Sequence, residues 1–255
     1  MATWNPTQYL KFKDHRLRPA LDLLGRIAVE DARTVYDLGC GPGNVTPFLG
    51  ERWPGARITG VDGSPEMLAK ARAQHPSIAW MEADLSDWTP AKPADVFFSN
   101  AALHWLDDHA TLFPRLLGRL RPGGALAIQM PRNYSEPSHT CILEAADAGP
   151  WGAKLKPYLR PMPVASPAEY YDIFAPVATT VDIWETVYVH PLQGDNPVVE
   201  WTKGSVLKPL LDGLGGADRE GFAAEYARRI KASYPKRPDG TTIFPFRRLF
   251  IVATR

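Results

Sequence analysis

The sequence has few cysteines and no long apolar segment. Its 255 residues include only Cys40 and Cys141, which are too few for a disulfide framework and suit a reducing cytosol. No run reaches the roughly 18 apolar residues that a membrane-spanning helix needs, and the first residues carry charge where a signal peptide would be apolar. We therefore expect a cytoplasmic protein that is not embedded in a membrane.

Neither sign of charge dominates, and no metal-binding pattern is present. Lys and Arg number 29 against 28 Asp and Glu, for a net charge of +1, which argues against a nucleic-acid-binding surface. The chain has no C-x-x-C or H-x-x-x-H spacing, so we expect no metal. It has no internal repeat, and nothing in it demands a partner protein. A monomer is the simplest expectation.

What the sequence does show is an alternation of strands and helices. Short apolar runs rich in β-branched and aromatic residues are followed by helical patterns, which predicts a doubly wound, mostly parallel α/β sheet. The expected strands are residues 34–39, 56–64, 78–85, 94–103, 125–131, 179–191 and 247–255.

Helix signals and prolines outline the rest of the chain. Residues 1–30 are expected to be helical, with Ala28 on the same face as Leu21, and Ser64 is expected to cap a helix that begins at Pro65. Proline is abundant, at 25 residues, about twice the usual proportion. We predict one domain over 1–255, with lid helices at 1–30, a core at 31–130, and insertions at 131–178 and 191–246 that form a cap.

Polar residues follow the first four predicted strands. The turn after the first strand, "DLGCGPGN" (37–44), is rich in glycine, and Asp62, Asp84 and Asn100 end or follow the next three strands. Ligands of open α/β sheets bind at this edge. The spacing G-x-G-x-G lacks the third glycine of a dinucleotide fingerprint, which weakens the reading as a nicotinamide-dependent oxidoreductase. Asp62 can accept hydrogen bonds from ribose hydroxyls, and Asp84 from an adenine amine.

The motifs "DLGCGPG", "GVDGSPEML", "ADL" and "ADVFFSNAALHWL…LRPGG" resemble the Rossmann-like S-adenosylmethionine-dependent methyltransferases. This resemblance implies a seven-stranded sheet whose last strand is antiparallel. It also implies S-adenosylmethionine as cofactor, with S-adenosylhomocysteine as product. By position it assigns a cofactor site to Tyr9, Arg18, Asp37, Gly39, Cys40, Gly41, Gly43, Asn44, Asp62, Gly63, Met67, Asp84, Leu85, Asn100 and Ala101.

Further segments resemble the bacterial trans-aconitate 2-methyltransferase family over the whole length: "WNPTQYLKF", "NAALHWLDDH", "QMPRN", "AGPW", "VEWTKG" and "FRRLFIVA". This resemblance implies a small carboxylic acid as substrate, esterified on one carboxylate. An ionised carboxylate needs no general base, so we expect no catalytic residue in that sense. Candidate substrate contacts are His104, Trp105, Arg132, Trp151, Trp201, Lys203 and Arg248.

Other functions remain open at this point. The acceptor could be another dicarboxylate, a carrier-bound malonyl group or a hydroxyl of a natural product, and a hydroxyl would need a base such as His104. The chain could also be a regulatory module that binds the cofactor without turnover. The large aromatic residues Trp105, Trp151 and Trp201 could serve packing alone.

Overall fold

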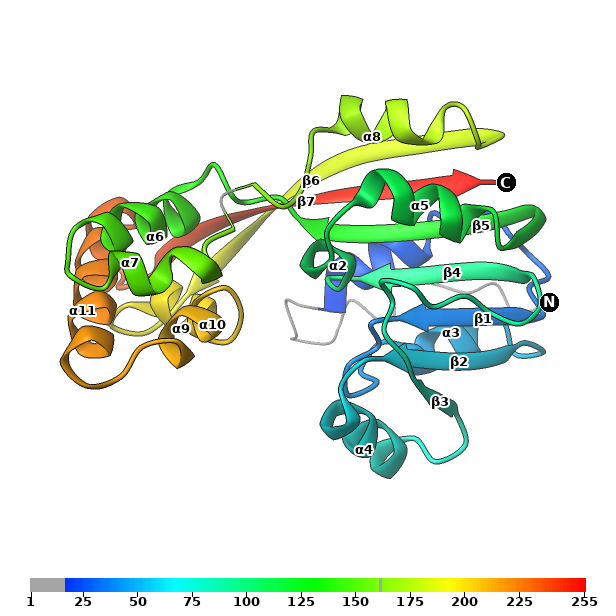
Figure 1. Ribbon diagram of the computed structural model, residues 1–255, viewed down its shortest axis with the longest axis horizontal. Coiled ribbons are helices and arrows are strands. Elements are labelled where there is room, and N and C mark those ends of the chain that lie inside the picture. The colour runs from blue at the N-terminus through cyan, green and yellow to red at the C-terminus, as the bar shows by residue number, and fades with distance from the viewer. Residues whose placement is uncertain (1–16, 161) are drawn as a thin grey trace. The chain divides into compact units, whose positions relative to one another are not determined.

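The computed structural model describes residues 17–160 and 162–255 of the chain. Within them, seven strands form one sheet in the order β3-β2-β1-β4-β5-β7-β6, which Figure 1 shows from bottom to top. The strands are β1 (Thr34–Leu38), β2 (Arg57–Asp62), β3 (Ala79–Glu82), β4 (Ala94–Asn100), β5 (Leu120–Pro131), β6 (Thr180–Leu192) and β7 (Thr242–Thr254). Strands β1 to β5 pair in parallel, and β7 runs antiparallel to β5. The predicted fold class is confirmed.

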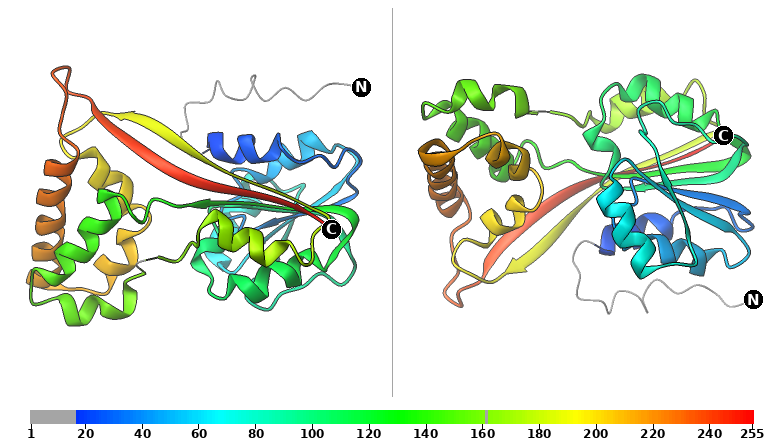
Figure 2. Two further views of the ribbon diagram at one scale, coloured as in Figure 1. Left: turned by 90° about the horizontal axis from the view of Figure 1, so that it is seen from above. Right: turned by 60° about the horizontal axis from the view of Figure 1, so that its bottom comes forward.

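Helices cover both faces of this sheet. Helix α2 (Leu17–Leu24) lies on one face, and α5 (His109–Leu117) and α8 (Pro167–Phe174) lie on the other (Figure 2, left). The remaining helices are α3 (Thr46–Arg52), α4 (Pro65–Gln74), the 3-10 helix η1 (Leu103–Trp105), α6 (Pro137–Asp147), α7 (Gly152–Leu155), the 3-10 helix η2 (Lys156–Tyr158), α9 (Pro197–Lys203), α10 (Leu207–Asp212) and α11 (Gly216–Ser233).

The helix starts follow local rules of sequence. The Ser64 side chain accepts a hydrogen bond from the backbone N–H of Met67, and α4 begins at Pro65 as predicted. A capping box between Ser166 and Glu169 starts α8. Helix α2 is shorter than predicted, because it ends at Leu24 in a turn that begins with Gly25. Ala28 consequently lies outside the helix and is exposed.

The chain divides into two compact units, each described here by itself. The sheet unit comprises residues up to Pro131, Val164–Thr186 and Arg248–Arg255, and the helical unit comprises Arg132–Pro163 and Val187–Arg247. The core of the sheet unit is built from fully buried strand residues, including Val35, Leu38, Val61, Val96, Phe97, Phe98, Leu126 and Ile128.

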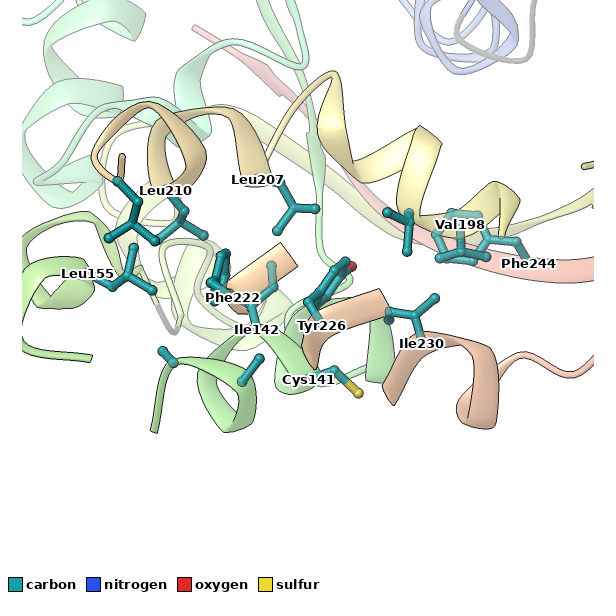
Figure 3. Close-up of a cluster of buried hydrophobic side chains, with 14 of the residues drawn as sticks. Cys141, Ile142, Leu155, Val198, Leu207, Leu210, Phe222, Tyr226, Ile230 and Phe244 are labelled. Atoms are coloured by element: carbon teal, nitrogen blue, oxygen red, sulfur yellow. The ribbon is translucent and has the colours of Figure 1, made fainter. Parts of the chain in front are cut away.

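The helical unit has its own hydrophobic cluster, in which Phe222, Tyr226 and Ile230 of α11 pack with Ile142 of α6 and Leu207 of α10 (Figure 3). In the described residues, no helix is long and apolar enough to cross a bilayer.

Candidate functional site

The carboxyl ends of β1 and β2 bring two aspartates together around the glycine turn. Asp37 in β1 is 3% exposed, and one of its carboxylate oxygens accepts a hydrogen bond from the Thr46 hydroxyl at 2.7 Å. Burial, together with the nearby negative charge of Asp62, raises the pKa of Asp37 to about 7, against a smaller opposing effect of the Thr46 hydrogen bond. A cationic ligand group beside Asp37 would restore its charged form.

Asp62 ties the turn after β1 to the turn after β2. Its carboxylate accepts hydrogen bonds from the backbone N–H groups of Gly41 and Ser64, each at 2.8 Å. A carboxylate has about four acceptor positions, so it retains capacity for ligand hydroxyl groups. Two neighbours that the sequence also predicted, Gly63 and Met67, are exposed beside it.

Glycine is needed at different positions of this turn for different physical reasons. A Cβ on Gly39 would lie 2.1 Å from the Cβ of Ala102, and one on Gly43 would lie 2.7 Å from the Trp80 ring. Packing inside the protein therefore excludes side chains at both positions. Among residues 17–160 and 162–255, no atom lies within 4 Å of the corresponding position at Gly41, so a ligand can approach the backbone there. Cys40 beside it is buried and Asn44 is exposed.

Asp84 follows β3 and lines a cavity of about 360 Å³ together with Ser86, Trp105, Leu106, Asp107, Asp108, Thr111, Leu112 and Arg115. Its carboxylate accepts a hydrogen bond from the Ser86 N–H at 2.9 Å, which lowers the pKa of Asp84 and keeps it ionised. The neighbouring Leu85 is buried. The pair offers an ionised acceptor at the edge of a cavity that an aromatic ring could enter.

The end of β4 carries a strained residue and an unpartnered oxygen. Ala101 has a positive φ of 54°, a conformation that costs a non-glycine residue about 1–2 kcal/mol. In the described residues, the buried Oδ1 atom of Asn100 accepts no hydrogen bond. Strain and unsatisfied polar groups of this kind concentrate at binding sites.

Two predicted substrate contacts follow β4, and one lies on β7. His104 is buried, whereas Trp105 is 47% exposed at the cavity of Asp84. Arg248 lies opposite Pro131, the last residue of β5, and its side chain donates a hydrogen bond to Gln129. These residues share the edge of the sheet that also carries Asp37, Asp62, Asp84 and Asn100.

The other predicted substrate contacts belong to the helical unit. Trp151 donates a hydrogen bond to the Ala145 carbonyl at 2.7 Å, and Trp201 stacks on His190 with ring centroids 4.7 Å apart. Both pack against the cluster of Figure 3. Lys203 forms an ion pair with Glu200, and the Arg132 N–H donates to the Arg247 carbonyl.

Of the two predicted lid residues, the structure describes Arg18. Arg18 in α2 has a side chain that is 61% exposed and lies 3.9 Å from Asp22. Tyr9 lies outside the described residues.

Sequence reasoning missed Arg115 and Gln129. Arg115 is hidden in an amphipathic helix pattern. Gln129 carried a signal, because it is the polar residue in "ALAIQM", a run that otherwise has the continuous apolar character of a buried parallel strand.

The arrangement fits a nucleoside-bearing ligand with a cationic end. Asp62 and Asp84 are acceptors on neighbouring strands, Gly41 leaves space beside them, and Asp37 with the free Oδ1 of Asn100 provides acceptors for a cation. S-adenosylmethionine has these groups: ribose hydroxyls, an adenine amine and an ammonium group.

Comparisons with known proteins identify related methyltransferases. The family described as "Methyltransferase domain" matches residues 35–124. The trans-aconitate 2-methyltransferase of Azoarcus sp. is 51% identical over 255 residues, covering 100% of both chains. That of Methylobacterium radiotolerans is 45% identical over 258 residues, covering 100% of this chain and 99% of its own.

Solved structures share the fold at low identity. The YcgJ protein of Bacillus subtilis superposes with a TM-score of 0.61 at 14% identity, covering 93% of this chain and 98% of its own. A methyltransferase-like protein, BH2331 of Bacillus halodurans, gives a TM-score of 0.60 at 11% identity, covering 92% and 97%.

Proposed function

Because the chain belongs to the trans-aconitate 2-methyltransferase family, we propose that it transfers a methyl group from S-adenosylmethionine to one carboxylate of trans-aconitate. The observation that carries this proposal is the full-length similarity to relatives of that name. It extends over residues 125–255, which the general methyltransferase family does not match. The substrate assignment therefore draws also on a part of the chain that lies outside the general methyltransferase match.

The cofactor would be held by the edge of the sheet described above. We assign the ribose hydroxyls to Asp62, the adenine amine and ring nitrogen to Asp84 and the Leu85 N–H, and the amino-acid end to Asp37, Gly39 and Asn100. The open space at Gly41 supports close backbone approach, and the hydrogen bonds at Asp62 support a fixed carboxylate. The other positions of the predicted cofactor site belong to the same proposal.

The reaction does not require the protein to transfer a proton. S-adenosylmethionine supplies a methyl group bound to a positively charged sulfur. A carboxylate with an ordinary pKa near 4 is ionised at neutral pH and can attack without a general base. The residues of the site must therefore orient the carboxylate oxygen behind the methyl group and exclude water. The aromatic ring of Trp105 is suited to the second task.

The remaining carboxylates of a tricarboxylate need cationic or hydrogen-bonding partners. We propose Arg248, which lies at the sheet edge beside Gln129, as the first of these. Arg132 and Lys203, with the predicted cap at 131–178 and 191–246, belong to the same proposal as further contributors. The proposal also includes a monomeric state and a cytoplasmic location. The two buried free cysteines support the reducing compartment.

The test is release of S-adenosylhomocysteine with a panel of acids: trans-aconitate, cis-aconitate, citrate, isocitrate and itaconate. We expect the highest kcat/KM with trans-aconitate. If kcat/KM is highest with another acid, that acid is the substrate, and the proposed methylation of a carboxylate still holds. S-adenosylmethionine binding without turnover on any acid would contradict the proposal and direct attention to hydroxyl acceptors, with His104→Ala as the variant to test.

A further inference from the structure

Gln129 is a polar residue in the interior of the sheet unit. It lies in β5, 0% exposed, between the apolar residues Ile128 and Met130. Its backbone carbonyl accepts a hydrogen bond from the N–H of Ala101, the residue with positive φ, at 2.9 Å. A primary amide in such a strand is unfavourable unless its donor and acceptor are both used.

The oxygen of this amide accepts a hydrogen bond from another side chain of the protein. The Arg248 guanidinium donates from Nη1 to Gln129 Oε1 at 3.3 Å, and Arg248 is itself 6% exposed. A guanidinium only donates hydrogen bonds, so it holds the amide with its oxygen toward Arg248. The amide nitrogen is thereby fixed on the other side.

The nitrogen of the amide has no hydrogen-bond partner among the residues that the structure describes. In the described residues, Gln129 Nε2 is buried and donates no hydrogen bond. A buried donor of this kind is expensive to leave unpaired, so it points to an acceptor that a ligand brings. The positive charge of Arg248 next to the amide favours an anionic acceptor over a neutral one.

We propose that Gln129 Nε2 binds a carboxylate of the acid substrate other than the one that is methylated, and that Arg248 positions the amide for this contact. The inference rests on the proposed function for the identity of the acid. It makes Gln129 a specificity-determining residue, because an acid without that carboxylate would leave the buried donor unpaired.

A carboxylate at this position could come from the substrate or from the amino-acid end of the cofactor. The strand order favours the substrate. Strand β4 lies between β1 and β5, so Gln129 is separated from the glycine turn after β1 by two strand spacings, about 10 Å. Asn100, in register with Gln129, is nearer to that turn, and its free oxygen suits a donor such as an ammonium group.

The test compares two substitutions with a matched control. Gln129→Leu removes the donor, and Gln129→Glu replaces it with an acceptor that can still pair with Arg248. Gln74→Glu adds the same charge on an exposed residue at the end of α4. Calorimetry measures trans-aconitate binding to the protein loaded with S-adenosylhomocysteine, and S-adenosylhomocysteine binding by itself.

We expect both Gln129 variants to bind trans-aconitate about tenfold or more weakly, with S-adenosylhomocysteine affinity and that of Gln74→Glu within about twofold of wild type. Circular dichroism should show that Gln129→Glu unfolds within a few degrees of wild type, which separates lost binding from lost folding.

The other outcomes contradict either this inference or the proposed function, and the two failures can be told apart. Weaker S-adenosylhomocysteine binding with unchanged trans-aconitate binding would show that Gln129 binds the carboxylate of the cofactor and not that of the substrate. No change in either affinity would show that Gln129 binds neither ligand. If wild type forms no methyl ester yet binds trans-aconitate through Gln129, the proposed reaction fails while the carboxylate site stands. If wild type forms the ester and the Gln129 variants keep its KM, the inference alone fails.

Discussion

The Arg115 guanidinium donates a hydrogen bond to the backbone carbonyl of Ser86 at 2.7 Å, and a second one to the Leu85 carbonyl at 3.1 Å. Helix α5 thus holds the loop that carries Asp84 and the Leu85 N–H. The loop has the two groups that we assign to adenine, so its position determines how well they meet the ring.

Substitution of Arg115 by Ala should therefore weaken cofactor binding, because the loop that carries Asp84 and Leu85 loses two of its hydrogen bonds. We expect S-adenosylhomocysteine affinity to fall about 5- to 20-fold, equivalent to about 1–2 kcal/mol for two lost hydrogen bonds. Isothermal titration calorimetry measures this directly. Arg119→Ala, at an exposed position just beyond α5, is the control, and equal affinities for the two variants would refute a positioning role for Arg115.

The raised pKa of Asp37 predicts how the unfolding free energy depends on pH. Its pKa is raised to about 7 in the folded protein from an ordinary value of 3.8, so the folded state holds more protons than the unfolded state between these values. Stability from this group is complete below pH 4 and is lost as pH rises through 7. Asp37→Asn should increase the unfolding free energy of the ligand-free protein at pH 8 by roughly 1–3 kcal/mol.

Urea titrations at pH 5 and pH 8 check this prediction for Asp37→Asn and for Asp31→Asn, an exposed control. The gain should appear at pH 8 and be much smaller at pH 5. The same Asp37→Asn variant should bind S-adenosylmethionine more weakly, because the ammonium group loses a charged partner. A variant that is destabilised at both pH values would show that the folded protein favours the ionised form of Asp37, which contradicts a raised pKa.

The positive φ of Ala101 predicts a substitution that stabilises the protein. Glycine adopts this conformation without the penalty of about 1–2 kcal/mol, but it adds about 0.4–1 kcal/mol of unfolded-state entropy. Ala101→Gly should raise the unfolding free energy by about 0.5 kcal/mol. Ala102→Gly, whose φ is −123°, should lower it. Thermal denaturation of the pair measures the difference, and the same sign for both would contradict the assigned strain.

His139 in the helical unit predicts sensitivity to acid. Burial lowers its pKa to about 4 from 6.5, so the unfolded state binds a proton that the folded state rejects. The unfolding free energy should fall as pH decreases from about 6.5 to 4. His139→Gln should reduce that loss by roughly 1–2 kcal/mol, measured by urea titration at pH 7 and pH 4.5. An unchanged pH dependence would assign the acid sensitivity to other groups.

Much of the sheet unit was predictable, because local signals and tertiary structure agree there. The alternation of apolar runs with helical patterns gave the parallel sheet, and Ser64 with Pro65 marked the start of α4 at the right residue. The strand ends followed as well, since Asp62 and Asn100 are the final residues of β2 and β4.

The parts that sequence reasoning missed depend on contacts that no local pattern encodes. Strand β7 begins at Thr242, five residues before the predicted start, because the exposed Pro245 interrupts the pattern without interrupting the strand. Arg115 gives no hint in its helix that it reaches the carbonyls of Leu85 and Ser86. Gln129 needed the structure to show which half of its amide is unpaired.

Methyl transfer to a carboxylate of trans-aconitate leaves a product that can be identified by its mass. Incubation of the protein with trans-aconitate and S-adenosylmethionine deuterated on its methyl group, followed by mass spectrometry of the acid, tests it most directly. We expect one trideuteromethyl ester per molecule of acid, formed in equal amount to S-adenosylhomocysteine. Recovery of unmodified trans-aconitate from a protein that binds S-adenosylmethionine would contradict it.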